Sequence, residues 1–196
     1  IALTGSSGLI GSHLLKDLLK DGHDVLCISS SNSSHEDNIF LYEELQSKEI
    51  SFKADFIIHL ASINSNLGKS DIPLEVELLN KALNCMEYLE CKNIIFFSTI
   101  KVYGENSFDS NFINVDENFP QNPECLYGLA KKYCEKALIG KSQEKNFNYL
   151  TFRLPPVLIN HPKSNVGKLL QLVEKGFPIP SFHIGDTNKR SFLSYA

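Results

Sequence analysis

The sequence predicts an α/β fold with a doubly wound parallel sheet, because short apolar runs alternate with amphipathic helical segments along the chain. The apolar runs are continuous, as in Val25–Ile28, which is typical of parallel strands buried on both faces. A glycine-rich loop directly follows the first run. The 196 residues suffice for one well-packed domain, or for one domain with a small appendage.

Continuous apolar runs that end at polar or turn residues predict the strands, which are residues 1–4, 24–29, 55–61, 93–98 and 148–154. Apolar side chains at helical spacing predict the helices, which are residues 12–20, 74–89, 126–138 and 166–175. Gly22 and Gly176 end the first and last of these helices, and Pro155 and Pro156 end the last strand. Residues 30–53 give a weaker signal, namely a Ser/Asn-rich loop, a short strand near 39–42 and one helical turn.

The patterns at both ends of the chain predict that residues of the protein are missing there. The first strand has few apolar residues before Gly5, fewer than a buried strand usually has. Residues 190–196 alternate like a strand, with no turn or cap after them.

The composition is that of an ordinary globular protein, with 42% apolar and 21% charged residues. A net charge of −4 disfavours recognition of nucleic-acid phosphates, so no nucleic-acid partner is expected. No apolar stretch approaches the ~20 residues of a membrane span, and no signal peptide is recognisable. The five cysteines include no Cys-x-x-Cys pair, which predicts reduced thiols and a cytoplasmic location.

The loop Gly5-Ser-Ser-Gly8-Leu-Ile-Gly11 lies between a predicted strand and a predicted helix, the setting of a nucleotide-binding loop. Its first glycine permits a tight turn, and the second lets the backbone approach a pyrophosphate. The third lets the helix pack close to the sheet, and the helix N-terminus offers free N–H groups to the phosphate. The loop predicts a dinucleotide site.

The second strand ends at Ser29, where an acidic residue usually binds the adenosine ribose of NAD. Ser29 could bond a ribose hydroxyl, and Ser30 could bond a 2′-phosphate. The end of this strand therefore does not decide between NAD and NADP as the cofactor.

Tyr127 and Lys131 are four residues apart on a predicted helix, and hence on one face. A lysine beside a tyrosine favours the phenolate form, which makes the tyrosine usable as a general base or acid. Upstream, Ser98 and Thr99 stand at the end of a strand, where an α/β sheet places its ligand crevice.

Together these motifs resemble the extended short-chain dehydrogenase/reductases, in particular the NAD-dependent epimerase/dehydratase family. The matching segments are Thr4–Gly11, His59–Ala61, Asn80, Ser98–Gly104, Tyr127–Lys131 with Glu135, and Arg153–Pro155. Residues 98–105 and the tail around 165–192 resemble bacterial enzymes similar to UDP-glucose and UDP-N-acetylglucosamine 4-epimerases of surface-polysaccharide synthesis. The resemblance implies a Rossmann-type sheet.

The resemblance also implies roles for individual residues. Thr99 would orient the substrate, Tyr127 would be the acid/base, and Lys131 would assist Tyr127 and hold the nicotinamide ribose. The implied cofactor-binding residues are Gly5, Ser7, Gly8, Leu9, Ile10, Gly11, Ser29, Leu60, Ala61, Ser62, Ser98, Tyr127, Lys131 and Pro155. The implied substrate-binding residues are Thr99, Asn165 and Arg190, the last of which would bind the nucleotide diphosphate.

Family resemblance further implies a division of the chain and a partner. Residues 1–154 would form the dinucleotide-binding domain, and residues 155–196 the start of an incomplete substrate lobe. A homodimer is expected, with helices 74–89 and 126–138 as candidates for a four-helix bundle.

His59 is expected to be a buried structural histidine. The remaining histidines lack metal-ligand spacing and are expected at the surface; they are His13, His23, His35, His161 and His183.

Reaction type depends on the two residues after Thr99. A family 4,6-dehydratase is expected to carry Asp-Glu there, and a decarboxylase a glutamate at the second position, whereas this chain has Ile100 and Lys101. A nucleotide-sugar 4-epimerase with a transient 4-keto intermediate and tightly bound NAD is therefore the favoured function. The alternatives are another nucleotide-sugar oxidoreductase of the family, either a 4-keto reductase or a dehydratase, and a non-catalytic NAD(P)-binding sensor.

Overall fold

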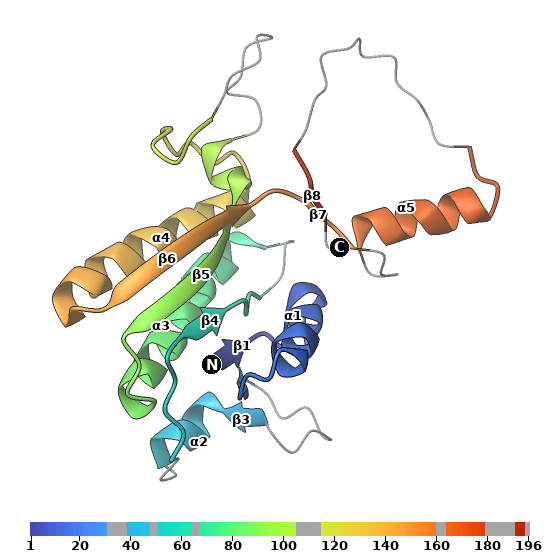
Figure 1. Cartoon of the computed structure of the whole chain (residues 1–196). Coiled ribbons are helices and arrows are strands. Elements are labelled where there is room, and N and C mark those ends of the chain that lie inside the picture. The colour runs from blue at the N-terminus through green and yellow to red at the C-terminus, as the bar shows by residue number, and fades with distance from the viewer. Residues whose placement is uncertain are drawn as a thin grey trace.

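Six parallel strands form the main sheet in the computed structural model of the chain, in the order β3-β2-β1-β4-β5-β6 (Figure 1). The structure describes residues 1–30, 39–47, 51–63, 67–104, 115–159, 164–178 and 191–194. The strands are β1 (Ala2–Thr4), β2 (Leu26–Ser29), β3 (Ile39–Leu41), β4 (Ile57–His59), β5 (Asn93–Thr99) and β6 (Asn148–Leu154). This strand order is that of the Rossmann-type fold, so the predicted fold class is confirmed.

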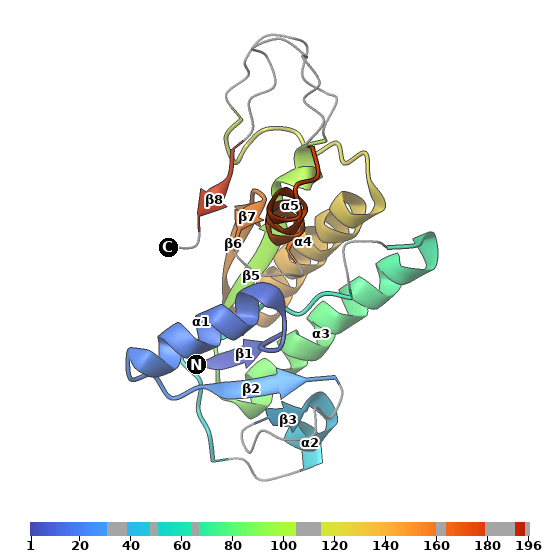
Figure 2. The same ribbon diagram turned by 90° about the vertical axis from the view of Figure 1, so that its right-hand side faces the viewer.

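Helices lie on both faces of this sheet (Figures 1 and 2). On one face lies α1 (Leu9–Lys20), and on the other lie α2 (Tyr42–Ser47), α3 (Ile72–Tyr88) and α4 (Leu126–Lys145). Side chains of α3 and α4 pack on the sheet to form the core, and they include Leu79, Leu83, Met86 and Leu138 against Ile57, Ile94 and Phe96. Short 3-10 helices follow β4 and β5, namely η1 (Lys69–Asp71) and η2 (Ile100–Tyr103).

The buried faces of α3 and α4 carry charged residues among the apolar ones. Glu75 shares the buried face of α3 with Leu79 and Met86, and Lys131 and Glu135 lie on the buried face of α4. A buried charge is costly unless it is paired and hydrogen-bonded. At these three residues the core therefore contains charged groups that need partners, in addition to apolar side chains.

Two helices are longer than predicted. α1 begins at Leu9, within the glycine loop, and α4 continues past the predicted end at Leu138 to Lys145. The last turns of α4 contain mostly polar side chains, so they have no apolar periodicity from which a helix could be predicted. Asn146, in the left-handed conformation with φ 53°, ends the helix.

Beyond β6, a second sheet of two parallel strands pairs β7 (Val157–Leu158) with β8 (Leu193–Ser194). β7 was not predicted, because a two-residue strand after two prolines has no recognisable pattern. The strand predicted over 190–196 is observed only as β8, while residues 190, 195 and 196 lie outside the described part. The helix α5 (Asn165–Glu174), predicted over 166–175, lies between β7 and β8 in the chain and extends away from the main sheet (Figure 1).

None of the five cysteines forms a disulfide, and Cys125 alone among them is not buried. Within the described ranges, no helix is long and apolar enough to span a membrane.

Candidate active site

The order of the strands reverses between β1 and β4, and open α/β sheets bind their ligands in the crevice at such a point. Gly5 follows β1 with φ +76°, and a Cβ atom there would lie 2.6 Å from the backbone nitrogen of Ala61. A Cβ atom on Gly11 would lie 2.0 Å from the carbonyl oxygen of Gly5. The glycines are therefore required for the close packing of the loop, which lies against Leu60 and Ala61, the residues predicted to line the nicotinamide.

The beginning of α1 completes this loop. Gly8 is the N-cap residue and has no side chain that could accept a hydrogen bond from the first turn, which also contains no acidic residue. The N–H groups of this turn lack acceptors within the helix, and they favour an anion such as a diphosphate. Ser7 and Gly8 are exposed, whereas Gly11 is buried. The loop thus fits the diphosphate of a dinucleotide.

The carboxyl end of β5, which carries Thr99, lies near the first turn of α4, which carries Tyr127. Thr99 is the last residue of the strand, and its hydroxyl oxygen accepts a hydrogen bond from the N–H of Lys101 at 3.3 Å. A Cβ atom on Gly128, next to Tyr127, would lie 2.5 Å from the carbonyl oxygen of Lys101. The chain after Thr99 therefore packs directly on the first turn of α4.

Lys131 lies one turn beyond Tyr127 with its side chain 3% exposed. Its Nζ atom is 5.9 Å from the centre of the Tyr127 ring and 5.0 Å from the centre of the Phe96 ring. Tyr127 itself is half-buried.

Glu75 is a site residue that the sequence analysis did not single out. Its carboxylate lies 2.9 Å from Lys131 Nζ and is 2% exposed. The resemblance included Asn80 instead, which lines a groove between α3 and α4, away from this pair. The signal that could have found Glu75 is its position on the apolar stripe of α3, where a charge needs a buried partner.

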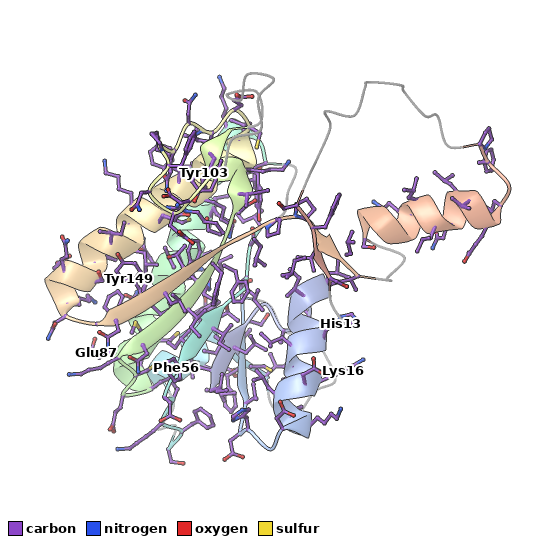
Figure 3. All side chains as sticks on the ribbon, turned by 45° about the horizontal axis from the view of Figure 1, so that its top comes forward. His13, Lys16, Phe56, Glu87, Tyr103 and Tyr149 are labelled. Carbon is purple, nitrogen blue, oxygen red and sulfur yellow. The ribbon has the colours of Figure 1, made fainter. Side chains whose placement is uncertain are left out.

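A second buried network holds the end of β5 to α4 and β6. The Ser98 hydroxyl donates to Glu135 Oε1 at 2.5 Å, and Arg153 Nη2 donates to Glu135 Oε2 at 2.8 Å. Arg153 Nη1 also donates to the Tyr103 hydroxyl oxygen at 2.6 Å, at the end of the molecule marked by Tyr103 in Figure 3. Hydrogen bonding to Glu135 raises the pKa of the Arg153 guanidinium above its usual range. In this structure Ser98, predicted to bind the cofactor, thus hydrogen-bonds within the protein.

The other predicted site residues have varied surroundings. Ser29 ends β2 and Pro155 follows β6, and both are half-buried. The Ser62 hydroxyl donates to Glu75 Oε1 at 2.7 Å. Arg190 and the side chain of Asn165 lie outside the described residues.

His59, at the end of β4, is buried, as expected, and its Nδ1 atom is hydrogen-bonded to the Thr4 hydroxyl at 2.8 Å. Burial, together with the charge of Lys131, lowers the pKa of His59 to about 3. His13 on α1 (Figure 3), expected at the surface, is half-buried, and its Nδ1 atom lies 2.9 Å from the Leu9 carbonyl oxygen. Among the residues that the structure describes, no cluster of His, Cys, Asp and Glu could hold a metal ion.

Acidification is expected to destabilise the protein through His59. The unfolded chain binds a proton at this residue below about pH 6.5, whereas the folded protein binds it only near pH 3. Stability is therefore lost as the pH falls through this window, by about 1.4 kcal/mol per pH unit from this residue. Denaturant unfolding of the wild type and His59→Gln from pH 7 to 4.5 measures the effect. Equal pH slopes for the two proteins would contradict it.

The sheet order and the glycine loop are those of a Rossmann-type fold, and Lys131 lies beside Tyr127 on a helix that packs against its sheet. The chain belongs to the NAD dependent epimerase/dehydratase family, whose model matches residues 1–193.

Among curated relatives, the UDP-glucose 4-epimerase of Vibrio cholerae is 28% identical, with 99% of this chain and 62% of the relative covered. This chain therefore spans about six-tenths of that enzyme's length. The solved structure of UDP-glucose 4-epimerase from Thermotoga maritima with UDP-glucose matches with a TM-score of 0.75 at 22% identity, covering 98% of this chain and 68% of that one.

A dTDP-glucose 4,6-dehydratase from Streptomyces venezuelae, solved as a double mutant with NAD bound, matches almost as well. Its TM-score is 0.74 at 16% identity, and 98% of this chain and 67% of that chain are covered. The fold is thus shared by epimerases and dehydratases, and it does not by itself distinguish their reactions.

Proposed function

We propose that the protein is a nucleotide-sugar 4-epimerase that uses tightly bound NAD. The observation that carries this proposal is the buried Lys131, whose Nζ atom lies 5.9 Å from the centre of the Tyr127 ring on a helix that packs against the chain just after Thr99. The similarity to UDP-glucose 4-epimerases supports the choice of substrate class. Bound in this crevice, NAD would accept a hydride from carbon 4 of the sugar and return it to the other face.

Each residue has a separate task in this proposal. The Thr99 hydroxyl orients the sugar hydroxyl, and Tyr127 takes its proton and later returns it. Lys131 keeps the phenolate favoured by its positive charge, and its remaining N–H groups hold the nicotinamide ribose. The glycine loop and the N-terminus of α1 bind the diphosphate of the cofactor, with Leu60 and Ala61 along the nicotinamide.

The residues after Thr99 support epimerisation over dehydration. Ile100 and Lys101 are exposed on η2. Because neither side chain is a carboxylate, neither position supplies a base that removes a proton from the carbon next to the ketone. A protonated lysine cannot act as that base. The intermediate is then reduced again without elimination.

Three further assignments belong to this proposal. Residues 155–196, with β7, β8 and α5, form the start of the substrate lobe, to which Asn165 and Arg190 would contribute.

The chain forms a homodimer through α3 and α4. A groove of about 640 Å³ between these helices supports this interface, and apolar side chains of both helices line it, among them Val76, Tyr133 and Ala137. The five cysteines, none of which forms a disulfide, support a location in the reducing cytoplasm, and the resemblance to the bacterial enzymes supports a role in surface-polysaccharide synthesis.

Product analysis tests the reaction. The protein is incubated with UDP-glucose, UDP-N-acetylglucosamine and lipid-linked N-acetylglucosamine, and the products are analysed for 4-epimers. We expect a product of unchanged carbon count and oxidation state, with no net accumulation of NADH. Stoichiometric NADH or a stable 4-keto-6-deoxy sugar would overturn the epimerase assignment, and bound cofactor without any turnover would indicate a sensor.

A further inference from the structure

The Glu75–Lys131 pair joins the proposed active site to α3. The two charged atoms are 2.9 Å apart, and the side chains are 2% and 3% exposed. Removing two charges from water costs several kcal/mol per ion, and a buried pair persists only when its remaining polar atoms are also satisfied. The surroundings of each partner show how far this condition is met.

The carboxylate of Glu75 is held at both oxygen atoms. Oε1 accepts from the Ser62 hydroxyl at 2.7 Å as well as from Lys131, and Oε2 accepts from the N–H of Ile63 at 2.9 Å. Ser62 and Ile63 belong to the loop after β4, which also contains Ala61, against which the glycine loop packs. The Glu75 carboxylate therefore binds both this loop and Lys131.

Lys131 is satisfied only in part. An ammonium group has three N–H donors, and within the described ranges Glu75 is its one hydrogen-bond partner. The centres of the Phe96 and Tyr127 rings lie 5.0 and 5.9 Å from Nζ. Two donors thus remain for a ligand, and Glu75 is the one carboxylate in the described ranges that pairs with the buried ammonium.

We propose that Glu75 is a positioning residue, which holds the charged Lys131 beside Tyr127 and couples it to the loop of residues 60–63. This proposal rests on the proposed function, in which Lys131 assists Tyr127 and binds the cofactor ribose. Among the described residues, the bonds of Glu75 go to Lys131, Ser62 and Ile63, and none goes to Thr99 or Tyr127. Glu75 acts by holding the ammonium group at a buried position from which an unpaired lysine side chain would move toward solvent.

The first test compares Glu75→Gln with Glu87→Gln, a change at an exposed position on the same helix (Figure 3). We expect kcat of Glu75→Gln to fall ~10- to 100-fold with little change in KM for the sugar, because Lys131 is misplaced. The acidic limb of the pH–rate profile should move to higher pH, since the cation no longer favours the Tyr127 phenolate. The other titratable groups that interact with Lys131, His59 and Cys134, are unchanged in both variants. An unmoved profile would overturn the proposal.

The second test does not require turnover. NADH binding followed by fluorescence should be about tenfold weaker in Glu75→Gln than in Glu87→Gln, because a charged hydrogen bond to the cofactor is lost or misdirected. If the wild type binds NADH but converts no nucleotide sugar, the proposed function fails and this test still judges Glu75. Equal NADH affinity in the two variants would overturn the positioning role.

The third test examines the pair itself by thermal unfolding. Lys131→Met leaves the Glu75 carboxylate buried without its cation, so we expect a lower Tm than in the double variant Glu75→Gln/Lys131→Met. Strictly additive changes in Tm would contradict a buried ion pair, and with it the proposal.

Discussion

Tyr127→Phe is expected to lower the turnover number at least ~100-fold while leaving the affinity for NAD largely intact. The change removes only the hydroxyl that transfers the proton, and the half-buried ring remains next to Lys131. Steady-state turnover of a UDP-sugar and NADH binding, measured on the same preparation, separate the two effects.

A tyrosine on the same helix provides the control. Tyr133 is 49% exposed on α4, and Tyr133→Phe should leave both turnover and binding unchanged. Turnover of Tyr127→Phe close to that of Tyr133→Phe would show that another group transfers the proton.

Glu135→Ala is expected to lower the free energy of unfolding by about 3 kcal/mol, because it leaves the Arg153 guanidinium without its anion. The Arg153 side chain is 20% exposed, so some solvent contact remains and the loss should be near the lower end for buried pairs. The hydroxyl of Ser98 and the side-chain amide of Gln121 also lose their acceptor. Denaturant unfolding at pH 7 measures the change.

An exposed ion pair serves as the control. Lys53 and Glu90 pair on the surface with side chains 71% and 64% exposed, and Lys53→Gln should cost at most about 1 kcal/mol. Glu135→Gln/Arg153→Met should recover part of the stability lost in Glu135→Ala. A loss in Glu135→Ala no larger than that in Lys53→Gln would mean that the network contributes little.

The network of Glu135 and Arg153 also bears on the site, because Ser98 precedes Thr99 and Glu135 lies one turn after Lys131. Arg153, on the neighbouring strand β6, lies opposite Ser98 in the sheet and donates a hydrogen bond to Glu135. The network thus fixes the end of β5 relative to α4, which is the geometry on which the proposed proton transfer depends. A rigid support of this kind is what a positioned acid/base needs.

Some features of this protein were determined by the sequence alone. The continuous apolar run of β2 and the helical spacing of α3 predicted these elements, because strand and helix periodicity depend on nearby residues. The spacing of Gly5, Gly8 and Gly11 predicted a nucleotide loop for the same reason, since the turn and the helix start are local.

Only the tertiary structure decided which polar side chains meet in the interior. Glu75 stands on the apolar stripe of α3 and its partner Lys131 on α4, and nothing in the local pattern of either helix names the other. Likewise, the packing of α4 on β5 brings Glu135 to the hydroxyl of Ser98, a contact that no local pattern predicted. Ion pairing and burial depend on how strands register and helices pack, and these are set by the whole chain rather than by neighbouring residues.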